Sequence, residues 1–72
     1  MSDDNKLVMM ANQIGKFFVP QKQVEPVGAI ATHIRKFWDP RMRAAIISHL
    51  DHGGAGLDEP VREAVQRLKE GA

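Results

Sequence analysis

Four prolines divide this chain into segments that are each about the length of one helix. Proline cannot continue a helix but is favoured in the first turn of a new one. These residues are Pro20, Pro26, Pro40 and Pro60. Between them, apolar residues recur at helical rather than strand spacing. The pattern predicts an all-α fold, a small antiparallel assembly of three to four helices in a single domain over 1–72, with helices at about 5–18, 26–38, 40–52 and 59–70.

Three of the predicted helices carry an apolar stripe at spacings of three and four residues. The first stripe is Leu7, Met10, Ala11, Ile14, Phe17 and Phe18. The second is Val27, Ile30, Ala31, Ile34, Phe37 and Trp38. The last is Val61, Ala64, Val65 and Leu68. Segment 40–52 differs because Ala44 and Ile47 lie outside its main stripe, which predicts burial on two sides, with a partner protein as a candidate for the second side.

The first two stripes are related by a shift of twenty residues, so that Phe17 corresponds to Phe37 and Phe18 to Trp38. One interpretation is a duplicated helical unit. The other is that two amphipathic helices draw on a small set of residue types. We favour the second, because two copies of a helical period are weak support for a repeat.

Composition excludes several classes of protein. A chain of 72 residues buries only about 60% of the surface that it exposes when unfolded, so we expect marginal stability. The absence of cysteine excludes disulfides, thiolate ligands for an iron–sulfur cluster and cysteine zinc sites in this chain. A net charge of +1 is far from the basic excess of a dedicated nucleic-acid binder. The acidic start and short apolar runs predict a soluble, cytoplasmic protein without a signal or membrane span.

The residues that could carry chemistry do not form a recognisable active site. His49 and His52 are three residues apart, but no third ligand has a fixed spacing, so we expect no metal site. Ser48 and His49 are adjacent, and adjacent side chains on a helix point about 100° apart. The glycine-rich segment 53–56 lacks a preceding strand and the Gly-Lys-Ser/Thr ending of a phosphate loop. We interpret it as a helix cap at Gly53 in a left-handed conformation, followed by a hinge that leads to Asp58, which can cap the last predicted helix. We expect no catalytic, cofactor-binding or metal-binding residue.

The segment 36–43, Lys-Phe-Trp-Asp-Pro-Arg-Met-Arg, is the strongest candidate for a docking site. Asp39 followed by Pro40 predicts an N-cap, so two helices meet there without a linker. Aromatic anchors flanked by arginines are typical of protein-interaction hot spots. Two alternatives stay open: the aromatics complete the core, or the cations of a helix-turn-helix meet phosphate. The predicted partner-binding residues are Arg35, Phe37, Trp38, Arg41, Met42, Arg43 and Ile47.

The chain resembles the delta subunit of NAD-dependent, molybdenum-containing formate dehydrogenases. The resemblance lies in segment 36–43, in 33–35 just before it, in 7–18 with 10–14 as its firmest part, in 48–51 and in the loop 53–58, and so covers nearly the whole chain. The resemblance implies a non-catalytic accessory subunit that supports assembly, stability or cofactor loading of an enzyme converting formate and NAD to carbon dioxide and NADH. The molybdenum cofactor, iron–sulfur clusters and flavin are then expected in partner subunits. The expected partners are those subunits, the large catalytic one in particular, and neither nucleic acid nor a membrane. The alternative is a small helical nucleic-acid-binding regulator.

Overall fold

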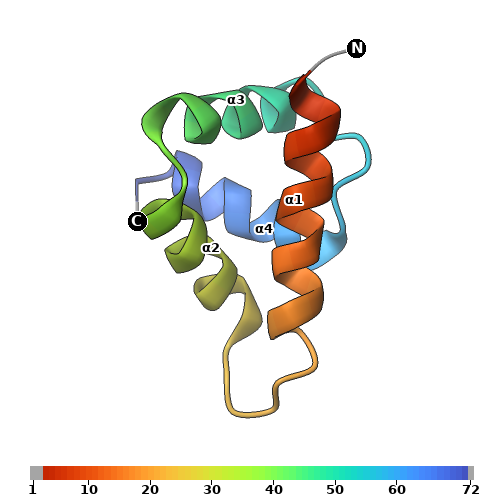
Figure 1. Cartoon of the computed structure of the whole chain (residues 1–72), viewed down its shortest axis with the longest axis vertical. Helices are drawn as coiled ribbons and strands as arrows, with labels where there is room; N and C mark the ends of the chain where they lie inside the picture. Colours follow the sequence, from red (N-terminus) through yellow and green to blue (C-terminus); the bar gives the residue numbers. More distant parts are fainter. Residues whose placement is uncertain (1–2, 72) are drawn as a thin grey trace.

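A computed structural model describes residues 3–71, and this part of the chain forms four α-helices without a strand (Figure 1). They are α1 (Asp3–Phe18), α2 (Pro26–Phe37), α3 (Pro40–Asp51) and α4 (Glu59–Lys69). The predicted all-α fold is therefore confirmed, and each predicted helix bound lies within two residues of the observed one. Met1, Ser2 and Ala72 of the predicted domain lie outside the described residues.

The helices form two crossed pairs. In Figure 1, α1 and α2 run in opposite directions beside one another, and α3 and α4 run in opposite directions across them. Helix α4 packs most extensively against α2, while α1 contacts the other three helices. The result is a packed helical assembly about a single core, with dimensions of 36 × 22 × 20 Å.

The core consists of apolar side chains from every helix and contains no buried charged or polar side chain among the described residues. Its largest fully buried members are Ile30, Ile34, Ile46, Val61 and Val65. The stripe predicted for α4 is confirmed, since Val61, Ala64 and Val65 are buried and Leu68 packs against them. In α3, Ile46 and Leu50 are buried, Ile47 packs partly against the core and Ala44 is exposed.

Two phenylalanines that the stripes placed in the core are on the surface instead. Phe17 is 65% exposed and Phe37 is 71% exposed. Phe17 lies six residues after the buried Ala11, which places it about 120° around the helix from that side chain. Beyond Phe37 the backbone becomes extended at Trp38 (φ −89°, ψ 140°), and the tryptophan side chain occupies the core in its place.

A close approach of α1 to α4 depends on a glycine. A Cβ added to Gly15 would lie 2.6 Å from Cγ2 of the fully buried Val61. No real Cβ contact is that short, so Gly15 is required for the observed spacing of these two helices. Apolar periodicity does not reveal this requirement, because it depends on how closely α4 approaches α1.

Helix ends are closed by side chains and backbone turns. Asp39 is the N-cap of α3, as predicted, and its Oδ1 accepts a 2.8 Å hydrogen bond from the amide of Met42. At the other end of α3, the amides of Gly53 and Gly54 donate to the carbonyls of Leu50 and His49 at 3.0 and 2.9 Å. These two bonds form a Schellman motif. Gly53 has a positive φ of +113°, as expected for a glycine that ends a helix, and the chain turns away from α3 there.

Glu25 is a second N-cap, one that the sequence analysis missed. Its carboxylate accepts hydrogen bonds from the amides of Gly28 (2.8 Å) and Val27 (3.1 Å) at the start of α2. It also forms a 3.1 Å ion pair with Arg67 of α4. The Gly28 hydrogen bond, with help from Arg67, lowers the pKa of the Glu25 carboxyl below its ordinary value of 4.5, against a smaller opposing effect of desolvation.

Candidate interaction surface

Trp38, the largest residue of the predicted docking segment, belongs to the core. It is 5% exposed and packs with the buried residues of the other helices. Of the two alternatives for its side chain, the structure therefore shows the core one. An indole in this position cannot anchor a partner unless the fold opens.

Arg43 is also engaged inside the molecule. Its Nη1 donates to the carbonyl oxygen of Arg35 at 3.2 Å and to that of Trp38. These carbonyls belong to the last turn of α2, where helices leave acceptors without partners. Arg43 therefore connects the first turn of α3 to the end of α2, which explains why an arginine stands so close after the Asp39-Pro40 junction.

The remaining predicted residues do not form one surface. Met42 and Ile47 pack partly against the core. Arg41 is exposed and borders a groove between α1 and α3 that Asp4 and Met10 also line. Arg35 and Phe37 lie at the exposed end of α2. The docking function of the seven predicted residues stays a prediction, and only Arg35, Phe37 and Arg41 among them are well exposed.

A different set of side chains forms a continuous aromatic row across α1 and α2. Phe17 stacks edge-on against Phe18, with ring centroids 5.0 Å apart, and the ring of His33 lies 6.1 Å from that of Phe18. The centroid of Phe37 is 4.8 Å from that of His33. We call Phe17, Phe18, His33 and Phe37 the aromatic face. Both of its end members are largely exposed, and they are the pair related by the shift of twenty residues.

Grooves lie on both sides of His33 and Phe18. One lies along α2 and is lined, besides Phe18, His33 and Phe37, by Glu25, Gly28, Ala29, Thr32 and Lys36. The other lies against α1 and is lined by Met10, Gln13, Ile14, Phe17 and the edge of Trp38. The aromatic face is thus a ridge between two shallow depressions, each lined by apolar and polar side chains.

The three histidines are held apart and serve structural contacts. Nε2 of His49 lies 2.8 Å from the carbonyl oxygen of Ala55, and Nδ1 of His52 lies 2.8 Å from that of Ser48. His33 lies between two phenylalanine rings. Within residues 3–71, no cluster of three or more histidine, aspartate or glutamate side chains could hold a metal ion.

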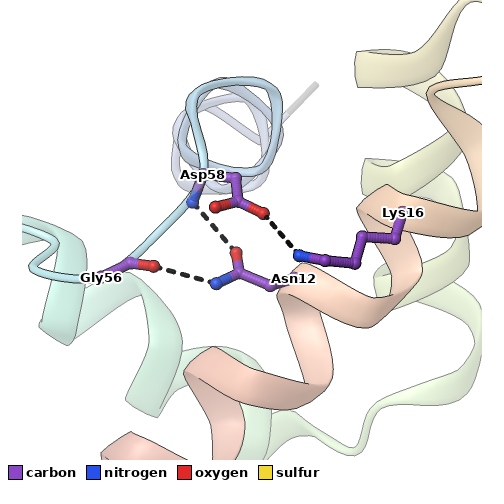
Figure 2. Close-up of polar contacts among 4 residues, drawn as sticks. All are labelled: Asn12, Lys16, Gly56 and Asp58. Atoms are coloured by element: carbon purple, nitrogen blue, oxygen red, sulfur yellow. Dashed lines mark hydrogen bonds and ion pairs between the residues drawn. The ribbon is translucent and has the colours of Figure 1, made fainter.

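The two segments that carried much of the family resemblance meet in the fold. Figure 2 shows Asn12 of α1 against the loop before α4. Its Nδ2 donates to the carbonyl oxygen of Gly56 at 2.9 Å, and its Oδ1 accepts from the amide of Asp58 at 3.0 Å. Asn12 thereby fixes the end of the glycine-rich loop to α1, a long-range contact that the sequence analysis missed.

Asp58 does not act as predicted. It occupies the N-cap position of α4, but its side chain makes no capping hydrogen bond. Instead, Oδ2 of Asp58 forms a 3.3 Å ion pair with Lys16 of α1 (Figure 2). The loop is further held by Arg62, whose Nη2 donates to the carbonyls of Gly53 and Gly54 at 2.9 and 3.2 Å. The predicted hinge is therefore a loop fixed from α1, α3 and α4.

Residues 6–65 match the family of the NADH-dependent formate dehydrogenase delta subunit, FdsD. The chain belongs to this family. The match includes the Asn12 contact, the aromatic face and the loop 53–58, and it confirms the resemblance seen over nearly the whole sequence. Neither the curated proteins nor the solved structures gave a match.

Membership of the FdsD family places the chain in a formate dehydrogenase. A delta subunit is one component of a formate dehydrogenase, so its partners are other subunits of that enzyme. Over the described residues, no helix has the length and apolar character needed to cross a membrane.

Proposed function

We propose that this chain is a non-catalytic accessory subunit that supports the assembly, stability or cofactor loading of a formate dehydrogenase. The observation that carries the proposal is the match to the FdsD family over residues 6–65. The reaction that the chain supports is the oxidation of formate to carbon dioxide with NAD, and the chemistry takes place in the other subunits.

Several polar side chains are used to hold the backbone in place, which supports a non-catalytic role. Asn12, Arg43 and Arg62 donate to backbone carbonyls of turns and helix ends. His49 and His52 also lie within hydrogen-bond distance of carbonyls. These contacts hold loops and helix ends in place, and none of them pairs a nucleophile with a general base.

The cofactors follow from the same proposal. The molybdenum cofactor, the iron–sulfur clusters and the flavin would be held by partner subunits, because this chain has no cysteine to ligate a cluster. The large catalytic subunit is the partner that we expect. An accessory chain of this size would act by covering apolar surface of that subunit, in the cytoplasm, where the complex is made.

Deletion of the chain tests this function. We expect the yield of active, cofactor-loaded formate dehydrogenase to fall, because subunits without their accessory chain are less stable or less completely loaded. The KM for formate of the surviving enzyme should be unchanged, since no residue here contacts substrate. An unchanged yield, or a changed KM at normal cofactor content, would contradict the proposal.

A further inference from the structure

The aromatic face and the groove beside it on α2 form the surface best suited to a partner. Phe17 and Phe37 stand at its two ends and are the most exposed large apolar residues among those described. We infer that this surface binds an amphipathic helix of another formate dehydrogenase subunit, with acidic residues beside the apolar stripe of that helix. The identity of the enzyme rests on the proposed function, whereas the location and chemistry of the contact rest on the observations below.

The rings are ordered before a partner arrives. Phe17 contacts Phe18 edge-on, and Phe37 contacts His33, so each exposed ring lies against a half-buried one. A ring already held in place loses little conformational freedom on binding, and its area is gained at low entropic cost. Such rings have the properties of binding hot spots.

The side chains that line the groove along α2 include two small ones, Ala29 and Thr32, together with the rings of Phe18 and Phe37. Small side chains let the backbones of two helices approach closely, because the distance between packed helices depends on the side chains at the contact. The approach would be made at Ala29 and Thr32, because the space beside Gly28 is taken by the carboxylate of Glu25, which lies 2.6 Å from the position of a Cβ there. An amphipathic helix in an apolar groove is a common mode of recognition, with anchors at positions i, i+3, i+4 and i+7.

The charge of the groove selects an acidic occupant. Helix α2 contains Arg35 and Lys36 and no acidic residue. Lys36 lines the groove and makes no hydrogen bond or ion pair with the described residues. Glu25, the acid at the groove edge, is already bound to two backbone amides and to Arg67. Opposite charges across an interface favour the correct partner and register, so carboxylates should face Lys36.

The same charges disfavour a second copy of this chain as the occupant. Two copies joined face to face through this surface would bring their α2 helices together, and each α2 contributes Lys36, which lines the groove, and contains no acidic residue. Like charges placed opposite one another across an interface cost several kcal/mol. We therefore assign the surface to a different subunit.

Competition during assembly tests the surface. Wild-type and variant chains with different tags are produced together with the remaining subunits, and the ratio of the two is measured in the purified enzyme. We expect Phe37→Ser and Lys36→Glu each to be incorporated at about a tenth of the wild-type level or less, which corresponds to about 1.4 kcal/mol. The controls are Val19→Ser, an exposed apolar residue beside α4, and Lys22→Glu in the exposed loop after α1. Both controls should compete equally with wild type.

Each result has one meaning. If Phe37→Ser is incorporated as well as wild type, the aromatic face is not the binding surface, but the proposed function still holds. If the wild-type chain itself does not enter the enzyme, the proposed function is wrong. If Lys36→Glu is incorporated as well as wild type, the inference that the partner places acidic residues opposite Lys36 is wrong. Circular dichroism of the variants checks that the exposed substitutions leave the helices folded.

A crosslink identifies the occupant. Phe37→p-benzoylphenylalanine, irradiated in the assembled enzyme, should join to a segment with apolar residues at helical spacing and flanking Asp or Glu. A crosslink to a basic segment, or to a second copy of this chain, would contradict the inference.

Discussion

Asn12 and Asp58, far apart in the sequence, are joined by a 3.0 Å hydrogen bond from the Asp58 amide to Oδ1 of Asn12. The same side chain donates to the carbonyl oxygen of Gly56, so one residue of α1 satisfies two backbone groups of the loop before α4. An asparagine suits this position because its amide combines a donor and an acceptor in one plane. The contact couples the loop to the helix that carries Phe17 and Phe18.

Replacing Asn12 should therefore loosen the loop and lower stability. Each of the two hydrogen bonds contributes about 0.5–1.5 kcal/mol net, so we expect Asn12→Ala to lower the free energy of unfolding by about 1–3 kcal/mol. Urea denaturation of the full chain measures this. Gln13→Ala, at an exposed neighbouring position, should change stability by less than about 0.5 kcal/mol. Equal effects of the two substitutions would show that the Asn12 contact contributes nothing.

Gly15→Ala should destabilise the protein although alanine is the better helix former. The added methyl would meet Cγ2 of Val61 at 2.6 Å, inside the core. Overpacking of this kind costs about 1–3 kcal/mol, which exceeds the gain of about 1 kcal/mol in helix propensity over most of that range. The variant Val61→Ala in the Gly15→Ala background removes the clashing methyl and should reduce the cost of the first substitution. A rise in melting temperature on Gly15→Ala alone would contradict the observed helix spacing.

Glu25 should make stability depend on pH in the acid range. Because its pKa is lowered in the folded state, the unfolded chain binds the proton more readily. The stabilisation is complete above the ordinary value of 4.5 and is lost as pH falls through the lower folded pKa. Urea midpoints of the wild type should therefore fall more steeply than those of Glu25→Gln between about pH 6 and about pH 3. Parallel pH profiles would show that the cap and the Arg67 pair contribute nothing.

Trp38 and Phe37 are neighbours with opposite roles. Trp38→Ala leaves a cavity in the core and should cost about 3–5 kcal/mol, enough to unfold much of so small a protein. Phe37→Ser removes a ring that is 71% exposed and should leave helicity nearly unchanged while incorporation into the enzyme is lost. Helicity and incorporation are measured on each variant. Loss of helicity in Phe37→Ser with a folded Trp38→Ala would reverse this assignment.

The sequence specified the helices better than it specified the surface. Proline positions and apolar spacing are local, and they placed the helix bounds, the Asp39 cap and the Gly53 reversal. The exposure of Phe17 follows from its position about 120° around the helix from Ala11, which helical spacing does contain. The exposure of Phe37 depends on where α2 ends and the backbone becomes extended, and periodicity carries no such information. The same holds for Gly15, whose role depends on the approach of α4.

The docking segment shows the same division between local and long-range information. Its composition correctly marked a junction between two helices, but composition does not separate an anchor from a core residue. Trp38 lies in the core because the backbone is extended after α2. Arg43 donates a hydrogen bond to the carbonyl of Arg35 at the end of that helix.

The central claim is that this FdsD chain supports the enzyme without taking part in its chemistry. Formate oxidation measured per bound molybdenum, in enzyme made with and without the chain, tests it most directly. The account predicts less molybdenum per catalytic subunit, or less assembled enzyme, without the chain, but the same turnover for each molybdenum that is bound. A turnover per molybdenum that falls when the chain is missing, in enzyme of intact subunit composition otherwise, would contradict it.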